Sequence, residues 1–117
     1  MDLMDISKNL QDTILDIAIS KGKLRGAYNT KSVAEANLAK VKACLAMGLR
    51  NGKQYELDDG MIINPPVTLM PDLIKGLCWK EALERDKAEG EVRALEQELR
   101  ALQSMLNGYQ TIHKHLD

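Results

Sequence analysis

The strongest pattern in this chain is a repeat of apolar residues near its C-terminal end, in the stretch EVRALEQELRALQSMLNGYQTIHKHL at 91–116. The apolar positions alternate in steps of four and three, the spacing of a coiled-coil or bundle helix. No proline follows Pro71, so we expect one long helix with Thr68 as its cap and Pro71 in its first turn. Gly76 and Gly90 weaken this helix by about 1 kcal/mol each relative to alanine, and we expect a bend or break near either. The repeat consists of Val92, Leu95, Leu99, Leu102, Leu106, Tyr109, His113 and Leu116.

Two further helices are predicted in the first half of the chain. Residues 3–20 place apolar side chains at i, i+3, i+4 and i+7, and Gly22 is a suitable helix end. Residues 33–50 repeat this spacing after Ser32, which forms a capping box with Glu35. The apolar face of the first helix is predicted to consist of Leu3, Ile6, Leu10, Ile14 and Ile17.

The chain changes character after Asn51-Gly52, which suits a left-handed helix end. In residues 54–63, two short extended runs flank the turn signal Asp59-Gly60, so this segment forms either a small β-hairpin or a loop. We predict an all-α helical bundle with a long C-terminal coiled-coil helix. An N-terminal region (1–64) and a C-terminal region (65–117) are expected to pack as one domain.

Opposite charge on the two halves of the chain supports intrachain or antiparallel packing of the C-terminal helix. Residues 1–54 carry a net charge of +4 and residues 55–117 carry −5, within a total of −1. A parallel homodimer would set Glu91 against Glu96 of its mate, which is an unfavourable like-charge contact. Beyond Met105 the apolar face broadens, which favours a bundle of three or more helices or a groove for a partner.

We therefore expect this helix to close the bundle and to help build a homo-oligomer, with an antiparallel dimer as the favoured form. The predicted oligomerisation residues are Val92, Leu95, Leu99, Leu102, Leu106 and Tyr109.

No pattern in the chain predicts catalysis, a cofactor or a metal site. Phosphate loops, nucleophile elbows and zinc-binding motifs are missing, and Cys44 and Cys78 are too isolated in sequence for a disulfide framework. His113 and His115 lie two residues apart at a helix end and point to different sides. We expect two reduced thiols and no enzymatic activity.

Nucleic-acid binding has a modest case in SKGKLRGAYNTK at 20–31, within a segment (20–54) in which eight cations face one acidic residue. The alternative is that these cations simply favour the negative end of a helix dipole. The candidate phosphate contacts are Lys21, Lys23, Arg25 and Lys31.

Trp79 is the leading candidate for contact with a protein partner. It lies off the main apolar stripe with Leu83 one turn later, and tryptophan is enriched at interface hot spots, although it is also a common core residue. Met105 and Tyr109 are further candidates, since methionine makes an adaptable binding surface.

The run INPPVTLMPDLIKGLCWKEALERDKAEGEVRALEQELRAL resembles the tails of small phage and prophage accessory proteins, in which Asn-Pro precedes an apolar helix and an acidic coil. The resemblance covers about a third of the chain, and Pro66, Pro71 and Gly76 depart from it. It implies action by binding to host factors.

The expected function is a non-enzymatic interaction protein, a small oligomeric regulator or inhibitor. A nucleic-acid-associated regulator is the alternative and a small-ligand binder the third reading. The acidic, amphipathic N-terminus is unlike a secretion signal, and no apolar run is long enough to span a membrane, so a cytoplasmic location is expected.

Overall fold

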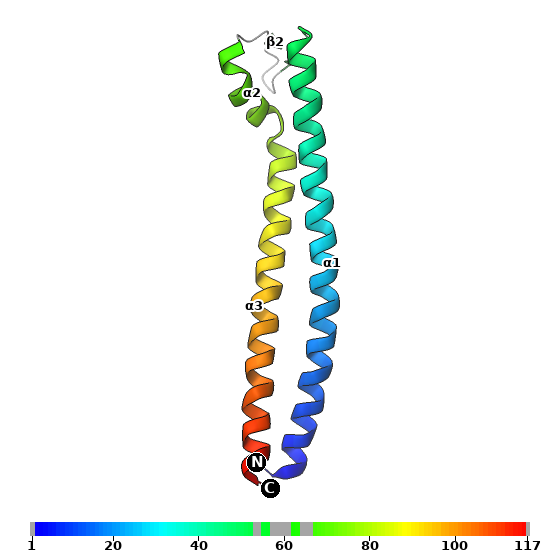
Figure 1. Ribbon diagram of the computed structural model, residues 1–117, viewed down its shortest axis with the longest axis vertical. Helices are drawn as coiled ribbons and strands as arrows, with labels where there is room; N and C mark the ends of the chain where they lie inside the picture. Colours follow the sequence, from blue (N-terminus) through cyan, green and yellow to red (C-terminus); the bar gives the residue numbers. More distant parts are fainter. Residues whose placement is uncertain (1, 53–54, 57–61, 64–66, 117) are drawn as a thin grey trace. The chain divides into compact units, whose positions relative to one another are not determined.

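The computed structural model describes residues 2–52, 55–56, 62–63 and 67–116. This part of the chain is almost entirely helical, so the predicted all-α fold with a long C-terminal helix is confirmed (Figure 1). None of its described helices is long and apolar enough to cross a membrane. The elements are α1 (Leu3–Arg50), β1 (Tyr55–Glu56), β2 (Ile62–Ile63), the 3-10 turn η1 (Val67–Leu69), α2 (Met70–Leu77) and α3 (Trp79–Leu116).

Helix α1 is continuous through 48 residues, so the prediction of two N-terminal helices is wrong. A glycine that ends a helix adopts a positive φ, and among the described residues only Gly52 does so, with φ of 79°. Gly22 instead keeps the helical conformation. Without a proline to remove a hydrogen bond, one glycine costs only about 1 kcal/mol, which neighbouring good helix formers and packing offset.

The predicted capping box at Ser32 is wrong for the same reason, because Ser32 lies inside α1. Glu35 pairs with Lys31 one turn earlier, with 3.9 Å between Nζ and Oε1. The helix begins further upstream, where the Asp2 carboxylate accepts a hydrogen bond of 2.9 Å from the Asp5 amide. This is an N-cap interaction, which satisfies one of the free amides of the first turn.

The predicted end of α1 at Asn51-Gly52 is confirmed. The Asn51 amide donates to the Met47 carbonyl and the Gly52 amide donates to the Leu49 carbonyl, both at 3.1 Å. Beyond it, β1 and β2 pair antiparallel, with Tyr55 opposite Ile63. The two extended runs predicted in 54–63 thus pair over two residues each, while the predicted turn Asp59-Gly60 lies outside the described residues.

The C-terminal helix is interrupted at Cys78, two residues after Gly76, so the expected break near one of the glycines is confirmed. The chain passes Gly90 without interruption. Pro71 lies in the first turn of α2 as predicted, but the cap residue is Leu69 without a side-chain hydrogen bond. The prediction of Thr68 as the cap is wrong, because Thr68 is itself part of the 3-10 turn that leads into α2.

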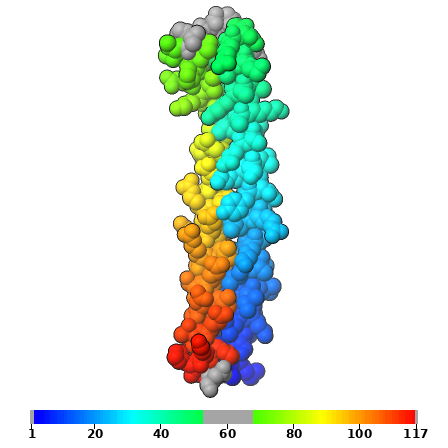
Figure 2. Space-filling view, viewed as in Figure 1, coloured from blue at the N-terminus to red at the C-terminus, as the bar shows by residue number. Residues whose placement is uncertain are grey.

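The chain divides into two compact units, which cut across the predicted regions 1–64 and 65–117. We call them the terminal unit (Met1–Thr30 with Glu89–Asp117) and the central unit (Lys31–Ala88). In the terminal unit, the blue start of α1 and the orange and red end of α3 run antiparallel and side by side (Figure 1). Their side chains meet in the space-filling view (Figure 2). Each unit has its own buried residues.

The core of the terminal unit is a narrow seam between these two helical segments. Ala27 of α1 is buried with Val92 and Leu95 of α3, and Leu24 packs against this cluster. In the part of α1 that belongs to the terminal unit, the buried residues together with Leu10 and Leu24 follow one another in steps of three and four, which is a heptad pattern. They are Ile6, Leu10, Thr13, Ile17, Ser20, Leu24 and Ala27.

Ile14 is not part of this seam, so its predicted place on the buried face of the first helix is wrong. Its side chain is 54% exposed, whereas the neighbouring Thr13 is buried. The hydroxyl of Thr13 donates 2.7 Å to the Asn9 carbonyl, which satisfies its hydrogen-bonding capacity inside the seam. Ser20 is buried as well, and no described residue bonds to its hydroxyl.

Candidate interaction surfaces

The residues predicted for oligomerisation lie in the seam of the terminal unit. Val92 and Leu95 are buried against α1 of the same chain. The next residues of the repeat, Leu99, Leu102, Leu106 and Tyr109, are half-buried. The expected packing of the C-terminal helix on the N-terminal part of the chain is thus present, and other residues of this unit supply its exposed surface.

A side-chain contact fixes which flank of one helix adjoins which flank of the other. We label the seam positions a and d, so that Val92 and Leu24 are a positions, and Tyr28 and Glu96 are both e positions. The Tyr28 hydroxyl donates a hydrogen bond to the Glu96 carboxylate. The e flanks of both helices therefore share one face of the terminal unit, and the g flanks share the other.

The same contact changes the acidity of Tyr28. The hydrogen bond to Glu96, partial desolvation and the nearby negative charge all raise the pKa of the Tyr28 phenol above its ordinary value of 10.0, the hydrogen bond most strongly. The phenol therefore stays neutral and remains a donor to Glu96 throughout the physiological pH range.

The first face, formed by the b and e positions, is basic. Its described residues carry five cations and two carboxylates, a net charge of +3. Both carboxylates are engaged, Glu96 with Tyr28 and Glu89 with Arg93 at 3.7 Å. We call this surface the basic face; its cations are Lys21, Arg25, Arg93, Arg100 and Lys114.

The second face, formed by the c and g positions, is acidic. It carries five exposed carboxylates and a single cation, Lys23, for a net charge of −4 among its described helical residues. Like charges at this spacing repel one another, so the face favours a cationic neighbour. We call this surface the acidic face; its carboxylates are Asp5, Asp12, Asp16, Glu91 and Glu98.

Each face also exposes large apolar side chains. On the basic face, Met4 is 82% and Ile14 54% exposed. On the acidic face, Ile19, Met105 and Ile112 are each between 43% and 50% exposed. The broadened apolar surface predicted beyond Met105 is thus present, on the flank that also carries aspartates of α1.

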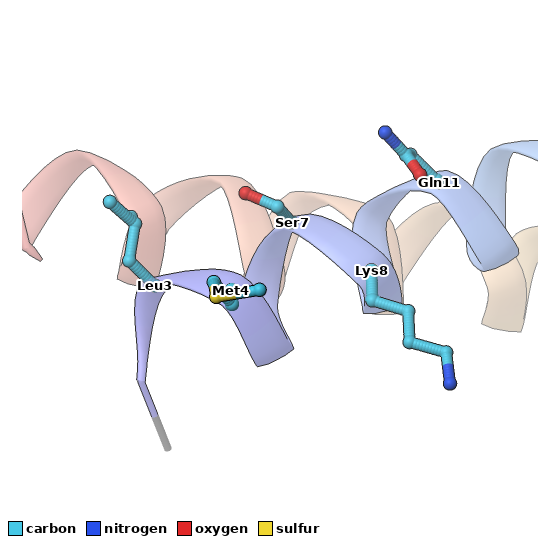
Figure 3. A pocket seen from close by; sticks show the side chains of 5 residues that line it. All are labelled: Leu3, Met4, Ser7, Lys8 and Gln11. Carbon is cyan, nitrogen blue, oxygen red and sulfur yellow. The ribbon is translucent and has the colours of Figure 1, made fainter.

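A hollow of about 300 Å³ lies at the start of α1. All five lining residues come from the first three turns of this one helix, and Lys8 points away from Ser7 and Gln11 (Figure 3). The hollow is an open depression on a helix surface, unlike the enclosed pockets that bury most of a small ligand. Its lining residues are Leu3, Met4, Ser7, Lys8 and Gln11.

In the central unit, two of the exposed large apolar residues lie at the start of α3. Trp79 is 49% exposed and Leu83, one turn later, is 43% exposed. The Lys80 ammonium lies 5.5 Å from the centre of the Trp79 ring. The preceding residue, Cys78, is only 1% exposed, so the exposed pair directly follows a buried residue.

The second hollow lies in the central unit and has a volume of about 380 Å³. It is lined by Ala46 and Arg50 of α1 and by Met70, Pro71 and Ile74 of α2. The lining is apolar apart from the exposed Arg50 guanidinium, so this hollow has few groups to orient a ligand.

The predicted partner-binding residues fall in different units, with Trp79 and Leu83 in the central unit and Met105 and Tyr109 in the terminal unit. The predicted phosphate contacts are also divided. Lys21 and Arg25 share the basic face, Lys23 lies on the acidic face, and Lys31 is paired with Glu35.

The structure adds Arg93 and Arg100 to the first two of these cations. Their place beside Lys21 and Arg25 depends on how α3 faces α1, which no pattern within one helix determines.

The remaining candidate groups are the cysteines and the histidines. The cysteines are both free, with Cys44 exposed and Cys78 buried. Within the described ranges, no cluster of three or more His, Cys, Asp or Glu side chains could hold a metal ion. His113 is half-buried in the seam and His115 is exposed, so they point to different sides as predicted.

No family model, curated protein or solved structure matches this chain.

Proposed function

We propose that this protein acts without catalysis, by binding a protein partner through a surface that includes Trp79 and Leu83. The observation that carries the proposal is the exposure of about half of each side chain, one turn apart at the start of α3. Tryptophan buried at an interface contributes a large apolar area and is a frequent hot spot. The resemblance to phage accessory proteins fits a regulator or inhibitor of a host protein in the cytoplasm.

The local structure favours a preformed binding surface. Helix α3 begins at Trp79, so the backbone of the exposed pair is already ordered, which lowers the entropic cost of binding. The Lys80 ammonium beside the indole leaves the ring with a polar border, which is typical of the rim of an interface.

The test is affinity capture from a lysate of the source cells, with the full chain as bait. The wild type is expected to retain a protein that Trp79→Ala and Leu83→Ala each release. Val33→Ala is a matched control, since Val33 is 70% exposed in the same unit. Far-UV circular dichroism must show unchanged helicity. Capture of the same proteins by all variants would contradict the proposal.

Trp79 also allows a direct measurement, because it is the only tryptophan in the chain. Addition of the purified partner is expected to shift its fluorescence to shorter wavelength as the indole leaves water. An unchanged spectrum under saturating partner would show that Trp79 lies outside the contact.

Nucleic-acid binding is the second candidate function, favoured by the convergence of cations on the basic face. Lys21 and Arg25 are one turn apart on α1, and Arg93 and Arg100 of α3 share their face. Such a group can contact successive phosphates and displace their counterions.

This candidate predicts binding of labelled oligonucleotides that weakens steeply with salt. In fluorescence anisotropy, Lys21→Ala and Arg25→Ala should each weaken binding and reduce the salt dependence by about one unit of slope. Lys23→Ala is the matched control, because Lys23 lies on the acidic face. Equal effects of all three substitutions would argue against a specific role of the basic face.

A further inference from the structure

The terminal unit has two flanks of opposite charge, and each flank exposes apolar side chains. A surface in contact with solvent alone does not need charges sorted by flank, because water solvates either sign equally well, whereas an interface between copies does. On the basic face, Ile14 lies one turn before Ala18 and two turns before Lys21 along α1. On the acidic face, Met105 and Ile112 of α3 share the flank that carries Asp12 and Asp16 of α1.

We propose that a second copy of this chain docks here, with the acidic face of one terminal unit against the basic face of the next. This inference goes beyond the proposed function, since it concerns the other unit and a different partner. The apolar side chains of the two faces supply the buried core of the contact, and the charges supply its orientation.

Charge decides between a face-to-opposite-face contact and a symmetric one. A two-fold contact would set each face against its own copy, bringing the five carboxylates of one acidic face against five others. Like charges placed opposite one another in an interface are strongly unfavourable. Opposite faces meeting each other bring net +3 against net −4, which is attractive and nearly balanced.

When the acidic face of one copy meets the basic face of another, the pair still has one free basic face and one free acidic face. Such heterologous contacts continue into a closed ring or an open chain of copies. The inference therefore differs from the antiparallel dimer expected from the C-terminal repeat, because Val92 and Leu95 of that repeat are buried inside each copy.

The test uses charge reversal in the full-length chain, followed by analytical ultracentrifugation from low to high micromolar concentration. Wild-type protein is expected to form species larger than a dimer as concentration rises and to dissociate in high salt. Reversal of the basic face (Lys21→Glu with Arg25→Glu) or of the acidic face (Asp12→Lys with Asp16→Lys) should each weaken self-association about tenfold or more. All four residues are exposed, so helicity should be unchanged.

Mixing the two variants gives the decisive measurement. One variant then carries faces of net −4 and −1, and the other carries faces of net +3 and 0, so neither has the opposed pair of the wild type. In the mixture, the −4 face of one variant meets the +3 face of the other, so the mixture is expected to associate more strongly than either variant alone. A double reversal in the central unit, Lys40→Glu with Lys42→Glu, is the matched control and should associate like wild type, since both lysines lie outside the two faces.

Three results would overturn the inference: a wild type that stays monomeric, single-face variants that associate like wild type, or a mixture that does not associate. A monomer that binds oligonucleotides through Lys21 and Arg25 would assign the basic face to nucleic acid instead. Trp79→Ala should leave self-association intact, so the failure of this inference and the failure of the proposed function are separate outcomes.

Discussion

The hydrogen bond between Tyr28 and Glu96 joins side chains of α1 and α3 in the terminal unit. It joins two e positions, and these lie on the same side of the seam only when the helices are antiparallel and in this register. Because Tyr28 is 43% exposed, water competes for the contact, so it contributes more to orientation than to stability.

The contact between Tyr28 and Glu96 predicts how the free energy of unfolding depends on alkaline pH. The pKa of the phenol is raised in the folded state, so the folded protein binds this proton more tightly than the unfolded chain does. The resulting stability is fully present below the unfolded pKa and is lost as the pH rises through the folded pKa. Tyr28→Phe should remove this alkaline loss, which urea unfolding across that pH window measures.

The pKa of Tyr28 can be measured from tyrosinate absorbance. Subtracting the titration of Tyr28→Phe from that of the wild type removes the contribution of the other tyrosines. Glu96→Gln is expected to move the pKa of Tyr28 down toward 10.0, since it weakens the hydrogen bond to the residue at position 96 and removes the neighbouring charge. Glu98→Gln is the control on the opposite flank and should leave it in place. An unchanged titration in Glu96→Gln would refute the assigned cause.

Single residues also show where sequence reasoning reached its limit. Ile14 is more apolar than Thr13, and a straight helix of 3.6 residues per turn can place either on the buried side. The seam follows the 3.5-residue repeat instead, which selects Thr13 and then Ser20. Hydrophobicity alone therefore predicts the wrong buried residue, Ile14, because the packing of the partner helix determines which position is covered.

At the scale of elements, the C-terminal repeat was predictable and the length of α1 was not. The residues of the repeat from Val92 to His113 are buried or half-buried, as a seam requires. In α1, Gly22 and Ser32 are local signals of a helix end and a helix start. The helix nevertheless continues through both residues, because no proline removes a backbone hydrogen bond there and the seam continues through Leu24 and Ala27.

The continuity of α1 through Gly22 and its end before Gly52 predict opposite effects of alanine at these two glycines. A methyl group at Gly22 would meet no atom within 4 Å, so Gly22→Ala should stabilise the protein by about 0.5 to 1 kcal/mol through helix propensity. Gly52→Ala should destabilise it by about 1 kcal/mol, because the φ of 79° at Gly52 is unfavourable for alanine.

Thermal unfolding followed by circular dichroism measures both changes, and Gly90→Ala is a second helical control in α3. A loss of stability in Gly22→Ala would contradict a continuous helix, since a left-handed glycine at the end of a shorter helix responds in that way.

For the whole molecule, the relation between charge and fold was only partly visible in the sequence. The two halves of the chain differ in net charge, which correctly favoured packing of the C-terminal helix on the N-terminal part. Within the terminal unit, however, charge is sorted by flank: Lys21 and Arg25 lie on one side and Lys23 on the other. This arrangement depends on the pairing of two helices, so the candidate site could not be read from either helix alone.

The division into two units predicts that local stability is set within each unit. Leu95 is 8% exposed in the core of the terminal unit, and Leu38 is 4% exposed in the central unit, so alanine at either should cost about 2 kcal/mol or more. Because compact units open separately when their contacts are internal, Leu95→Ala should increase amide hydrogen exchange mainly in 2–30 and 89–116. Leu38→Ala should do so mainly in the described part of 31–88, which makes the two variants controls for each other. Exchange that rises equally in both units in either variant would show that α1 and α3, which run through both, transmit the loss and that the chain unfolds as one cooperative body.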